Sequence, residues 1–526
     1  MAKKSNNPTR KDLKELQERQ KYLTDKSRAK AVEKRHLQGK RTARENIEDL
    51  CDSDTFQEIG SLIVAGQKGR KPLEELRKNT PADGLISGIG KINSNRFSQN
   101  TNCYVLSYDY TVLAGTQGAF NHKKTDRLMA LAEKANCPIV FFVEGGGGRP
   151  GDVDFSLVST GGLDLSTWSS FARLSGKIPR IAIVGGYCFA GNAAIAGCAD
   201  VIIATTDASM GMGGPAMIEG GGLGSHHPKD IGPSKKLAKC GVVDVVVSDE
   251  KEAVLIAKKY LSYFQGTEKK WSVEPQELLH SILPTDRRYA YDVNKIIDVL
   301  ADKDSVLELR SDFAKNMVTS LIRIEGRPLG LIANSTRHLG GAIDSDAADK
   351  AARFLQLCNA FQIPVVSLCD TPGFMVGPEH EELGLIRHSS RLFITAAALE
   401  VPLITIVLRK AYGLGAMAMA GGSFHESFLT LSWQSGEFGA MGLEGAVKLG
   451  FKKELEQAKN TKERDALYNQ LVAQEYEKGK AINAAETLEF DEVIDPVETR
   501  ARIVTALQCY QSKNQFSSNS RFIDSW

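Results

Sequence analysis

The stretch IAIVGGYCFAGNAAIAG occupies residues 181–197, and a similar stretch, ITIVLRKAYGLGAMAMAG, occupies residues 404–421. Each begins with a continuous apolar run rich in β-branched residues, which is typical of a buried strand. Each then breaks at glycine and resumes as a run of small residues, which predicts a tight turn and a helix. The chain therefore contains the same strand–turn–helix unit twice.

A helix that begins at such a turn has backbone N–H groups without intrahelical partners in its first turn. These groups favour an anion or a developing oxyanion at that place. Neither turn carries a serine, histidine or carboxylate motif, so the backbone donors would have to do the chemistry, each contributing about 3–4 kcal/mol of transition-state stabilisation. The alternative is that the glycines only let the helix pack close to the strand. The repetition of the unit favours the oxyanion interpretation.

The repetition extends beyond the turns. A helical run, a strand and a loop precede each turn in the same order, at residues 124–135, 137–143 and 144–147 and again at 346–359, 363–369 and 370–373. A further helix follows each loop, at 166–174 and 385–398. Repeated units with continuous apolar strands predict parallel β layers covered by helices. The sequence therefore predicts an α/β protein of two homologous halves, divided near residue 285 in a polar segment with prolines.

Composition places the 526 residues among ordinary globular chains, with 42% hydrophobic residues, 25% charged residues and a net charge of +2. This near balance implies neither nucleic acid nor an acidic membrane surface as a partner. Residues 1–50 differ, with 15 Lys and Arg against eight Asp and Glu in helix-forming order. We interpret them as a solvated basic helical arm rather than an RNA-binding arm, because Tyr22 is their only aromatic residue of the Phe, Trp and Tyr types.

The nine cysteines include no Cys-x-x-Cys pair, which favours a reducing compartment and hence the cytoplasm. The polar start lacks the apolar segment of a secretory signal; a transit peptide remains open, although acidic residues at 12–18 count against it. The longest apolar stretch, 393–408, is too short to cross a bilayer, so no membrane span is expected. His226 and His227 lack a third ligand at metal spacing, so no metal is expected.

Several short motifs follow one another along the chain. They are KRHLQGKRTARE (34–45), LPTD (283–286), YD (291–292), LIAN (331–334), GGAIDSDAADKAARF (340–354), DTPGF (370–374) and RKAYG (409–413). Together they resemble the carboxyltransferase (β) subunit of biotin-dependent acyl-CoA carboxylases, over nearly the whole chain after the first thirty residues. The resemblance implies two tandem crotonase-like (ClpP/crotonase) α/β domains with parallel β-β-α units, at residues 1–284 and 285–526.

The resemblance also implies a division of labour between the two domains. The N-terminal domain would bind acyl-CoA, and the amides of Ala190 and Gly191 would stabilise the thioester enolate. The C-terminal domain would receive carboxybiotin, and the amides of Leu414 and Gly415 would hold its ureido oxygen. Release of CO2 leaves a basic biotin nitrogen beside the substrate, which can take the α-proton, so no side-chain base is needed.

Further candidate contacts surround the two turns. Those for the substrate are Gly145, Gly146, Gly147, Gly148, Arg149, Asn192, Gly213, Gly214 and Met417, and those for biotin are Gly373, Phe374, Tyr412, Gly413 and Ala416. The run of four glycines permits close backbone approach to a ligand. Arg149 either meets a CoA phosphate or braces this loop. The glycine cluster at 211–222 is either a mobile acyl-CoA lid or a connecting loop.

Met417 departs from the family pattern. It stands where many short-chain members carry an acidic residue that lines the acyl pocket, so a preference for acetyl-CoA or propionyl-CoA does not carry over. Met417 and Met419 suggest a wider apolar surface. We therefore expect a long-chain or otherwise divergent acyl-CoA as the substrate.

Biotin is expected on another chain, because the sequence AMAM at 416–419 lacks the lysine of a biotin attachment site. No phosphate-binding loop with its strand context is present, so the biotin carboxylase and the biotin carboxyl carrier would also be separate chains. The resemblance implies a homohexamer, a trimer of dimers in which the N-terminal half of one subunit faces the C-terminal half of another. Two other functions stay open, the α subunit of a biotin-dependent acyl-CoA decarboxylase and a non-catalytic crotonase-fold scaffold.

Overall fold

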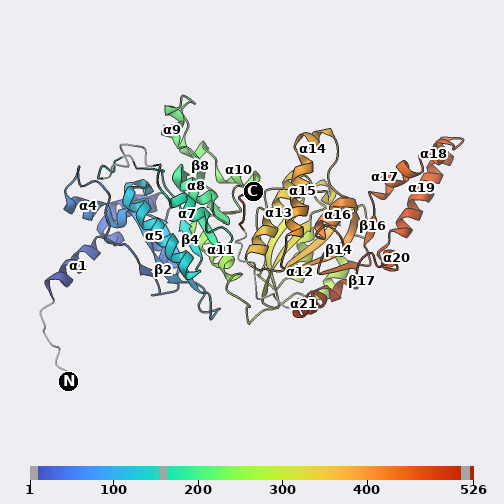
Figure 1. The fold of residues 1–526 in the computed structure, drawn as a ribbon, viewed down its shortest axis with the longest axis horizontal. Helices are drawn as coiled ribbons and strands as arrows, with labels where there is room; N and C mark the ends of the chain where they lie inside the picture. Colours follow the sequence, from blue (N-terminus) through green and yellow to red (C-terminus); the bar gives the residue numbers. More distant parts are fainter. Residues whose placement is uncertain (1–9, 150, 155–162, 511–521) are drawn as a thin grey trace, which may run out of the picture. The chain divides into compact units, whose positions relative to one another are not determined.

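The computed structural model describes residues 10–149, 151–154, 163–510 and 522–526. Its internal contacts divide the chain into two compact units, which consist mainly of the residues up to Gln265 and of those from Gly266 onward (Figure 1). The division comes earlier than residue 285 because the intervening segment belongs to the second core. Leu279 is completely buried there, and the amide of Glu268 donates to the carbonyl oxygen of Gly326 at 2.9 Å.

The first unit is built on a seven-stranded sheet of order β1-β2-β3-β4-β5-β7-β9. β1 pairs with β2 and β2 pairs with β3 in antiparallel fashion, and the strands from β3 to β9 run parallel to one another. The strands are β1 (Gln57–Glu58), β2 (Leu85–Lys91), β3 (Asn102–Tyr108), β4 (Ile139–Phe142), β5 (Arg180–Val184), β7 (Val201–Thr205) and β9 (Val245–Val247). The main helices are α3 (Ala43–Leu50), α5 (Ala119–Ala135), α7 (Thr167–Ala172), α8 (Gly191–Gly197), α10 (Ser234–Lys239) and α11 (Glu250–Ser262).

The second unit repeats this plan in an eight-stranded sheet of order β10-β11-β12-β13-β14-β15-β17, with β16 paired to β14. Its strands are β10 (Leu307–Glu308), β11 (Met317–Ile324), β12 (Arg327–Asn334), β13 (Val365–Thr371), β14 (Leu403–Tyr412), β15 (Leu429–Trp433), β16 (Glu437–Gly439) and β17 (Glu492–Ile494). Its helices include α12 (Val293–Leu300), α13 (Ser345–Ala360), α14 (Pro378–Glu382), α15 (Leu385–Ala397), α16 (Gly413–Met419), α17 (Leu443–Gly450), α18 (Lys452–Glu456), α19 (Thr461–Lys478), α20 (Ala481–Ala485) and α21 (Thr499–Cys509).

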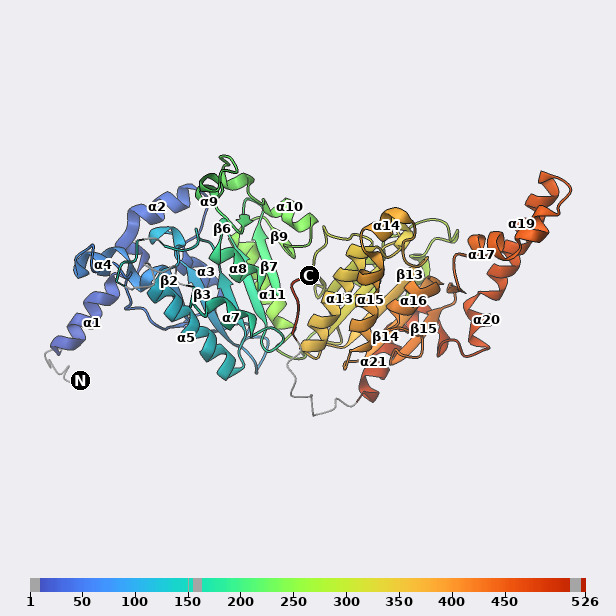
Figure 2. The same ribbon diagram turned by 45° about the horizontal axis from the view of Figure 1, so that its top comes forward.

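The predicted parallel layers in two α/β halves are confirmed. In each unit an antiparallel pair leads into parallel strands, and α5 or α13 makes the first parallel crossover. Figure 2 shows α13 and α15 side by side against the second sheet. Every residue of β5 and β13 is buried, as expected for strands covered on both faces.

The N-terminal arm is helical, as α1 (Lys11–Lys21) and α2 (Ala29–Leu37), and α1 has no buried residue. Its later part is different. Arg35 and Thr42 are buried, and Thr42 caps α3 in a reciprocal pair of hydrogen bonds with Glu45. Residues from Arg35 onward are therefore part of the first unit's packing rather than of a solvated arm.

The two halves also share a buried lysine on their first crossover helix. Lys124 of α5 donates to the carbonyl oxygen of Leu85, and Lys350 of α13 donates to that of Phe313 at 2.8 Å. Burial lowers the pKa of Lys124 to about 8 and that of Lys350 to about 7. The neighbouring carboxylates of Glu58 and Glu308 oppose this shift.

The stability of the second unit should therefore rise with pH between about 7 and 10. An unfolded lysine keeps its proton up to a pKa near 10.5, whereas folded Lys350 loses it near 7, so the unfolded chain binds more protons in this range. We expect the free energy of unfolding to rise by at least about 1 kcal/mol more in the wild type than in Lys350→Met between pH 7 and pH 9.5. Urea unfolding of both proteins measures this, and an equal rise in both would contradict it.

Candidate active site: the two repeated turns

The first turn lies at the end of β5. The chain passes through Gly185 and Gly186 into a short strand, β6 (Tyr187–Phe189), which pairs with β8 (Ser209–Gly211). Ala190 then has a φ of +52°, a value that glycine adopts readily but that strains a residue with a Cβ, and α8 begins at the next residue. The predicted strand, turn and helix are present, with an additional two-stranded element inserted between strand and helix.

The second turn also follows a strand and begins a helix. Here one continuous strand, β14, takes the place of β5 and β6. The end of β14 pairs with β16, and Gly413 has a φ of +56°. Phe189 pairs with Gly211 in the first unit, and Tyr412 pairs with Gly439 in the second. Counting from these pairings, Gly413 holds the position in the second turn that Ala190 holds in the first.

This register changes the donors assigned at the first turn. The amide of Ala190 donates to the carbonyl oxygen of Gly211 at 2.9 Å, so it is occupied and does not serve as the predicted donor. Gly191 and Asn192 follow in the first turn of α8, and Leu414 and Gly415 hold the equivalent positions in α16. In the described part of the chain, none of these four amides donates a hydrogen bond. The available pairs are thus Gly191/Asn192 and Leu414/Gly415.

Close packing requires glycine within both turns. A Cβ on Gly191 would lie 2.2 Å from Oε1 of Gln117 and 2.9 Å from Trp168. A Cβ on Gly415 would lie 2.7 Å from Cα of Gly373. Distances below 3 Å force the neighbours to move, and the Gly415 contact is backbone. Each pair of free amides therefore includes a glycine where an added side chain would force neighbouring atoms to move, side-chain atoms at Gly191 and backbone atoms at Gly415.

The loop Gly145–Gly148 lies against the first turn. The carbonyl oxygen of Gly145 accepts from the amide of Phe189 at 3.0 Å, and the amide of Gly147 donates to Oδ1 of Asn192 at 2.9 Å. Gly145 and Gly147 are buried, whereas Gly146 and Gly148 are exposed. The side chain of Asn192 thus clamps the glycine loop, and its backbone amide remains available.

Arg149 braces this loop. Its guanidinium pairs with Asp83 at 2.5 Å and with Asp152 at 3.3 Å, and only 4% of its side chain is exposed. Burial raises the pKa of Asp83 to about 6 despite this pair. Of the two interpretations of Arg149, the geometry favours bracing over contact with a CoA phosphate.

The glycine cluster after β8 contains a short helix, α9 (Pro215–Gly220), which begins directly after Gly214. A Cβ on Gly213 would lie 3.1 Å from the sulfur of Met217, and one on Gly214 would lie 3.5 Å from Phe189. Met212 and Met217 are largely exposed. The segment therefore carries exposed apolar side chains close to the first turn, which suits the lid interpretation better than a plain connection.

The candidate biotin contacts divide into buried and accessible residues. Tyr412 and Ala416 are buried, and the Tyr412 hydroxyl donates to Glu437 at 2.8 Å, so these two support the turn from beneath. Gly373 is also buried, and its carbonyl oxygen accepts from the amide of Ile343. Phe374 is half-buried, with its ring 6.0 Å from that of Phe393.

Leu414 and Met417 are exposed on α16, whereas Met419 is completely buried. The prediction that Met417 and Met419 form one apolar surface is therefore wrong for Met419. Residues two apart point to different sides of a helix. Gly413 is partly exposed beside Leu414. The accessible side chains at the second turn are apolar.

Two buried carboxylates, which sequence patterns did not reveal, anchor the loops before the turns. Asp370 of β13 accepts from Nε of Arg409 at 3.1 Å, from Nζ of Lys410 at 2.6 Å and from the hydroxyl of Tyr291 at 2.9 Å. Glu144, directly before Gly145, accepts hydrogen bonds from the two terminal guanidinium nitrogens of Arg35. The available signal was their position, since each is an acidic residue close to the end of a buried strand, one residue before Gly145 and three residues before Gly373.

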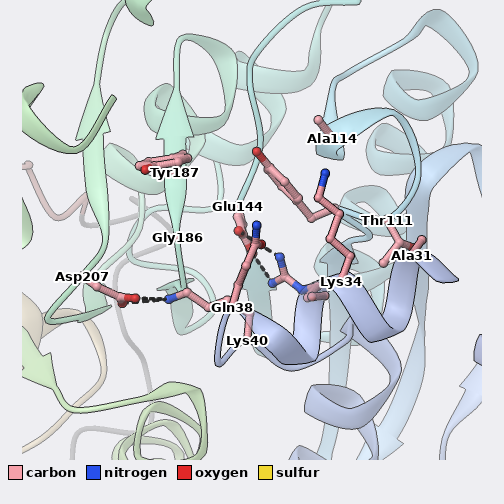
Figure 3. A pocket seen from close by; sticks show the side chains of 12 residues that line it. Ala31, Lys34, Gln38, Lys40, Thr111, Ala114, Glu144, Gly186, Tyr187 and Asp207 are labelled. Atoms are coloured by element: carbon pink, nitrogen blue, oxygen red, sulfur yellow. Dashed lines mark hydrogen bonds and ion pairs between the residues drawn. The ribbon is translucent and has the colours of Figure 1, made fainter. Parts of the chain in front are cut away.

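A cavity of about 650 Å³ lies beside the first turn (Figure 3). Gly186 and Tyr187 line it from the turn, and Lys34, Arg35 and Lys40 line it from the N-terminal segment. Among the described residues no group of three or more His, Cys, Asp or Glu side chains could hold a metal ion. No helix in the described ranges is long and apolar enough to span a membrane.

Comparison with known proteins decides the family. The carboxyl transferase domain matches residues 34–523. The chain belongs to the carboxyl transferase family. This carboxyltransferase is 34% identical over 522 residues to the methylmalonyl-CoA carboxyltransferase 12S subunit of Propionibacterium freudenreichii subsp. shermanii, covering 96% of this chain and 95% of that one. It is 31% identical to the biotin-dependent long chain acyl-coenzyme A carboxylase beta4 subunit of Mycobacterium tuberculosis, over 96% and 95% of the two chains.

Solved structures agree with this assignment. The carboxyltransferase superposes on a transcarboxylase 12S hexamer crystal structure with a TM-score of 0.85, 31% identity and 99% coverage of both chains. It superposes on a single-chain, multi-domain long-chain acyl-CoA carboxylase with a TM-score of 0.90 and 52% identity, covering 95% of this chain and 49% of that larger protein. The predicted crotonase-like fold is confirmed.

Proposed function

We propose that this carboxyltransferase moves CO2 from carboxybiotin to the α carbon of an acyl-CoA thioester. The supporting observation is the pair of register-matched turns, each with two unoccupied amides at a helix start. Carboxybiotin is here a second substrate, which arrives on a separate carrier chain. The names of the relatives agree with this chemistry. They include a methylmalonyl-CoA carboxyltransferase subunit and a propionyl-CoA carboxylase beta chain.

The first turn is assigned to the acyl-CoA. Removing the α-proton places negative charge on the thioester oxygen, and the amides of Gly191 and Asn192 are placed to donate to that oxygen. Fixed backbone donors stabilise developing charge without reorganising, and losing one typically lowers the rate about 100- to 1000-fold. The Asn192–Gly147 hydrogen bond keeps the helix start and the glycine loop in one geometry.

The second turn is assigned to biotin. Its ureido ring is neutral and compact, which suits the apolar rim of Leu414 and Met417 around two backbone donors. The amides of Leu414 and Gly415 would hold the ureido oxygen while CO2 is released. The nitrogen thereby made basic takes the α-proton, so the turns need no side-chain base.

Partners follow from this chemistry. The biotin carboxylase and the biotin carboxyl carrier are proposed as separate chains, as the subunit names of the relatives indicate. We place the enzyme in a homohexamer, a trimer of dimers, because the 12S structure is described as a hexamer assembly. All nine cysteines are free thiols, which suits a cytoplasmic location.

A long acyl chain is the expected substrate. The exposed, uncharged Leu414 and Met417 and the 52% identity to the long-chain enzyme both support this choice. Carboxylation of an acyl-CoA series from C2 to C16 by the chain, reconstituted with its carboxylase and biotinylated carrier, tests it. We expect kcat/KM to rise by about tenfold or more from propionyl-CoA to long-chain substrates, since each buried CH2 contributes about 0.8 kcal/mol. Activity confined to acetyl-CoA and propionyl-CoA would show that the chain-length assignment is wrong.

A further inference from the structure

The carbonyl oxygen of Gly191 accepts a hydrogen bond from a side chain outside its own helix. Nε1 of Trp168, on α7, donates to it at 3.1 Å. This carbonyl and the amide of Asn192 are the two ends of one trans peptide group, so they point in opposite directions. A hydrogen bond that fixes the carbonyl therefore also fixes the direction of the Asn192 amide. It polarises the same peptide group, which makes that amide a stronger donor.

The indole of Trp168 also packs directly against Gly191. A Cβ on Gly191 would lie 2.9 Å from Cζ2 of Trp168 and 2.2 Å from Oε1 of Gln117. Gln117 is buried and is itself held, because its Nε2 donates to the hydroxyl of Tyr108 at 2.8 Å. Gly191 thus lies between the indole and a buried amide side chain.

The second turn forms without an equivalent donor. Leu414 holds the position that Gly191 holds in the first turn, and no side chain in the described ranges donates to its carbonyl oxygen. The backbone of Gly373 packs there instead, since a Cβ on Gly415 would lie 2.7 Å from its Cα. The strand, turn and helix therefore do not require an indole N–H in order to form. The Trp168 hydrogen bond belongs to what is particular to the first turn.

A chain of hydrogen bonds orients the ring that packs on this indole. The ring of His122, on α5, lies 5.3 Å from that of Trp168 at 55°. Nδ1 of His122 lies 2.9 Å from Oγ1 of Thr167, which donates to Oδ1 of Asp126 at 2.5 Å. A hydroxyl has one hydrogen, and Asp126 accepts it, so Nδ1 of His122 is the donor to Thr167. His122 and Thr167 are buried, and α7 packs against both α5 and α8 (Figure 2).

We propose that Trp168 is a positioning residue for the carboxyl transfer, whose indole N–H directs and polarises the Gly191–Asn192 peptide toward the thioester oxygen. His122 and Thr167 act through Trp168, because they hold its ring. This inference rests on the proposed function, which assigns the acyl-CoA to the first turn. Negative charge collects on the thioester oxygen only as the enolate forms. The strengthened amide therefore stabilises the transition state more than the bound substrate, and it raises kcat rather than lowering KM.

Replacing Trp168 with phenylalanine keeps an aromatic ring and removes the N–H. We expect W168F to lower kcat for acyl-CoA carboxylation about tenfold and to leave KM for acyl-CoA within about twofold of the wild type. The full chain, reconstituted with its carboxylase and biotinylated carrier, is the enzyme to assay. Trp271→Phe is the matched control, because Trp271 is 46% exposed in the second unit, and its kcat should stay within about twofold of the wild type. An unchanged kcat in W168F, or a loss that lies wholly in KM, would overturn the positioning role.

Thr167→Val tests whether the hydrogen-bonded chain acts through the indole. It should lower kcat about threefold in the wild type and have no further effect in W168F, since the two residues form one unit. Thr167→Ser restores the hydroxyl and should return kcat to within about twofold of the wild type. Losses that multiply in the double variant, or a serine variant as slow as the valine variant, would overturn the inference. T167V retains the indole, so an unchanged kcat in T167V would overturn it even if W168F did not fold.

These outcomes are distinct from a failure of the proposed function. If the wild type carboxylated no acyl-CoA, the proposed function would be wrong and the role of Trp168 with it. If the wild type were active and folded W168F matched it in kcat, only the role of Trp168 would be wrong.

Discussion

Replacing Gly191 with alanine is expected to lower kcat for acyl-CoA carboxylation about 100-fold or more. The added Cβ would lie 2.2 Å from Oε1 of Gln117 and 2.9 Å from Trp168, so the helix start or these two side chains must shift. Trp168 also donates to the carbonyl oxygen of Gly191 at 3.1 Å, which couples the two. A shift of this size displaces a donor from the developing oxyanion, and losing one donor costs about 2.7–4 kcal/mol in the transition state.

Gly197→Ala is the matched control for this variant. Gly197 ends the same helix, and a Cβ there would meet nothing within 4 Å. Its kcat should stay within about threefold of the wild type, and its thermal midpoint should rise slightly because alanine favours the helix. Both variants are to be compared at saturating carrier and acyl-CoA, with circular dichroism to confirm folding. If folded Gly191→Ala matched Gly197→Ala in kcat, the first turn would not be the oxyanion site.

The sequence predicted the strands, turns and helices around the site because their signals are local. The apolar runs of β5 and β14, the glycines after them and the small residues of α8 and α16 all lie within one segment of each half. The residue-by-residue correspondence between the two turns was harder to predict from the sequence. It depends on the pairing of β6 with β8 and of β14 with β16, which join segments separated in sequence.

The same limit explains the individual errors at the site. Sequence alone did not reveal that the Ala190 amide is taken by Gly211, because that bond belongs to the pairing of β6 with β8. Arg149 was ambiguous because its partner Asp83 lies far earlier in the chain. Met419 was misplaced for a local reason, since the helical period alone separates it from Met417. Long-range contacts therefore decide which residues of a recognised turn are free to act.

In each half an arginine holds the anchoring carboxylate, but the two arginines come from different elements of the fold. Glu144 is held by Arg35, whose guanidinium lies 5.4 Å from the ring of Tyr110. Asp370 is held by Arg409, whose guanidinium lies 5.0 Å from the ring of Tyr291. Arg35 comes from the N-terminal helix α2, whereas Arg409 comes from the adjacent strand β14. The first unit thus takes this arginine from the N-terminal segment. The second unit takes the corresponding arginine from a strand of its own sheet.

Replacing Asp370 with asparagine is expected to destabilise the second unit by about 3–5 kcal/mol. Asp370 is completely buried, and the change would leave the buried Arg409 and the adjacent Lys410 without their counter-charge. Removing one partner of a buried ion pair costs this much because the remaining charge stays desolvated. Urea unfolding followed by the fluorescence of the completely buried Trp433 measures the effect.

Glu274→Gln provides the comparison, because Glu274 pairs with Lys303 at 2.8 Å where both side chains are more than 40% exposed. That variant should lose less than about 1 kcal/mol. The double variant D370N/R409M should recover part of the stability lost by D370N, since it removes one of the stranded charges. Equal losses in D370N and Glu274→Gln would show that Asp370 does not anchor the second turn. A loss confined to D370N would show that the stability of the second unit depends on the buried contacts of this carboxylate with Arg409 and Lys410.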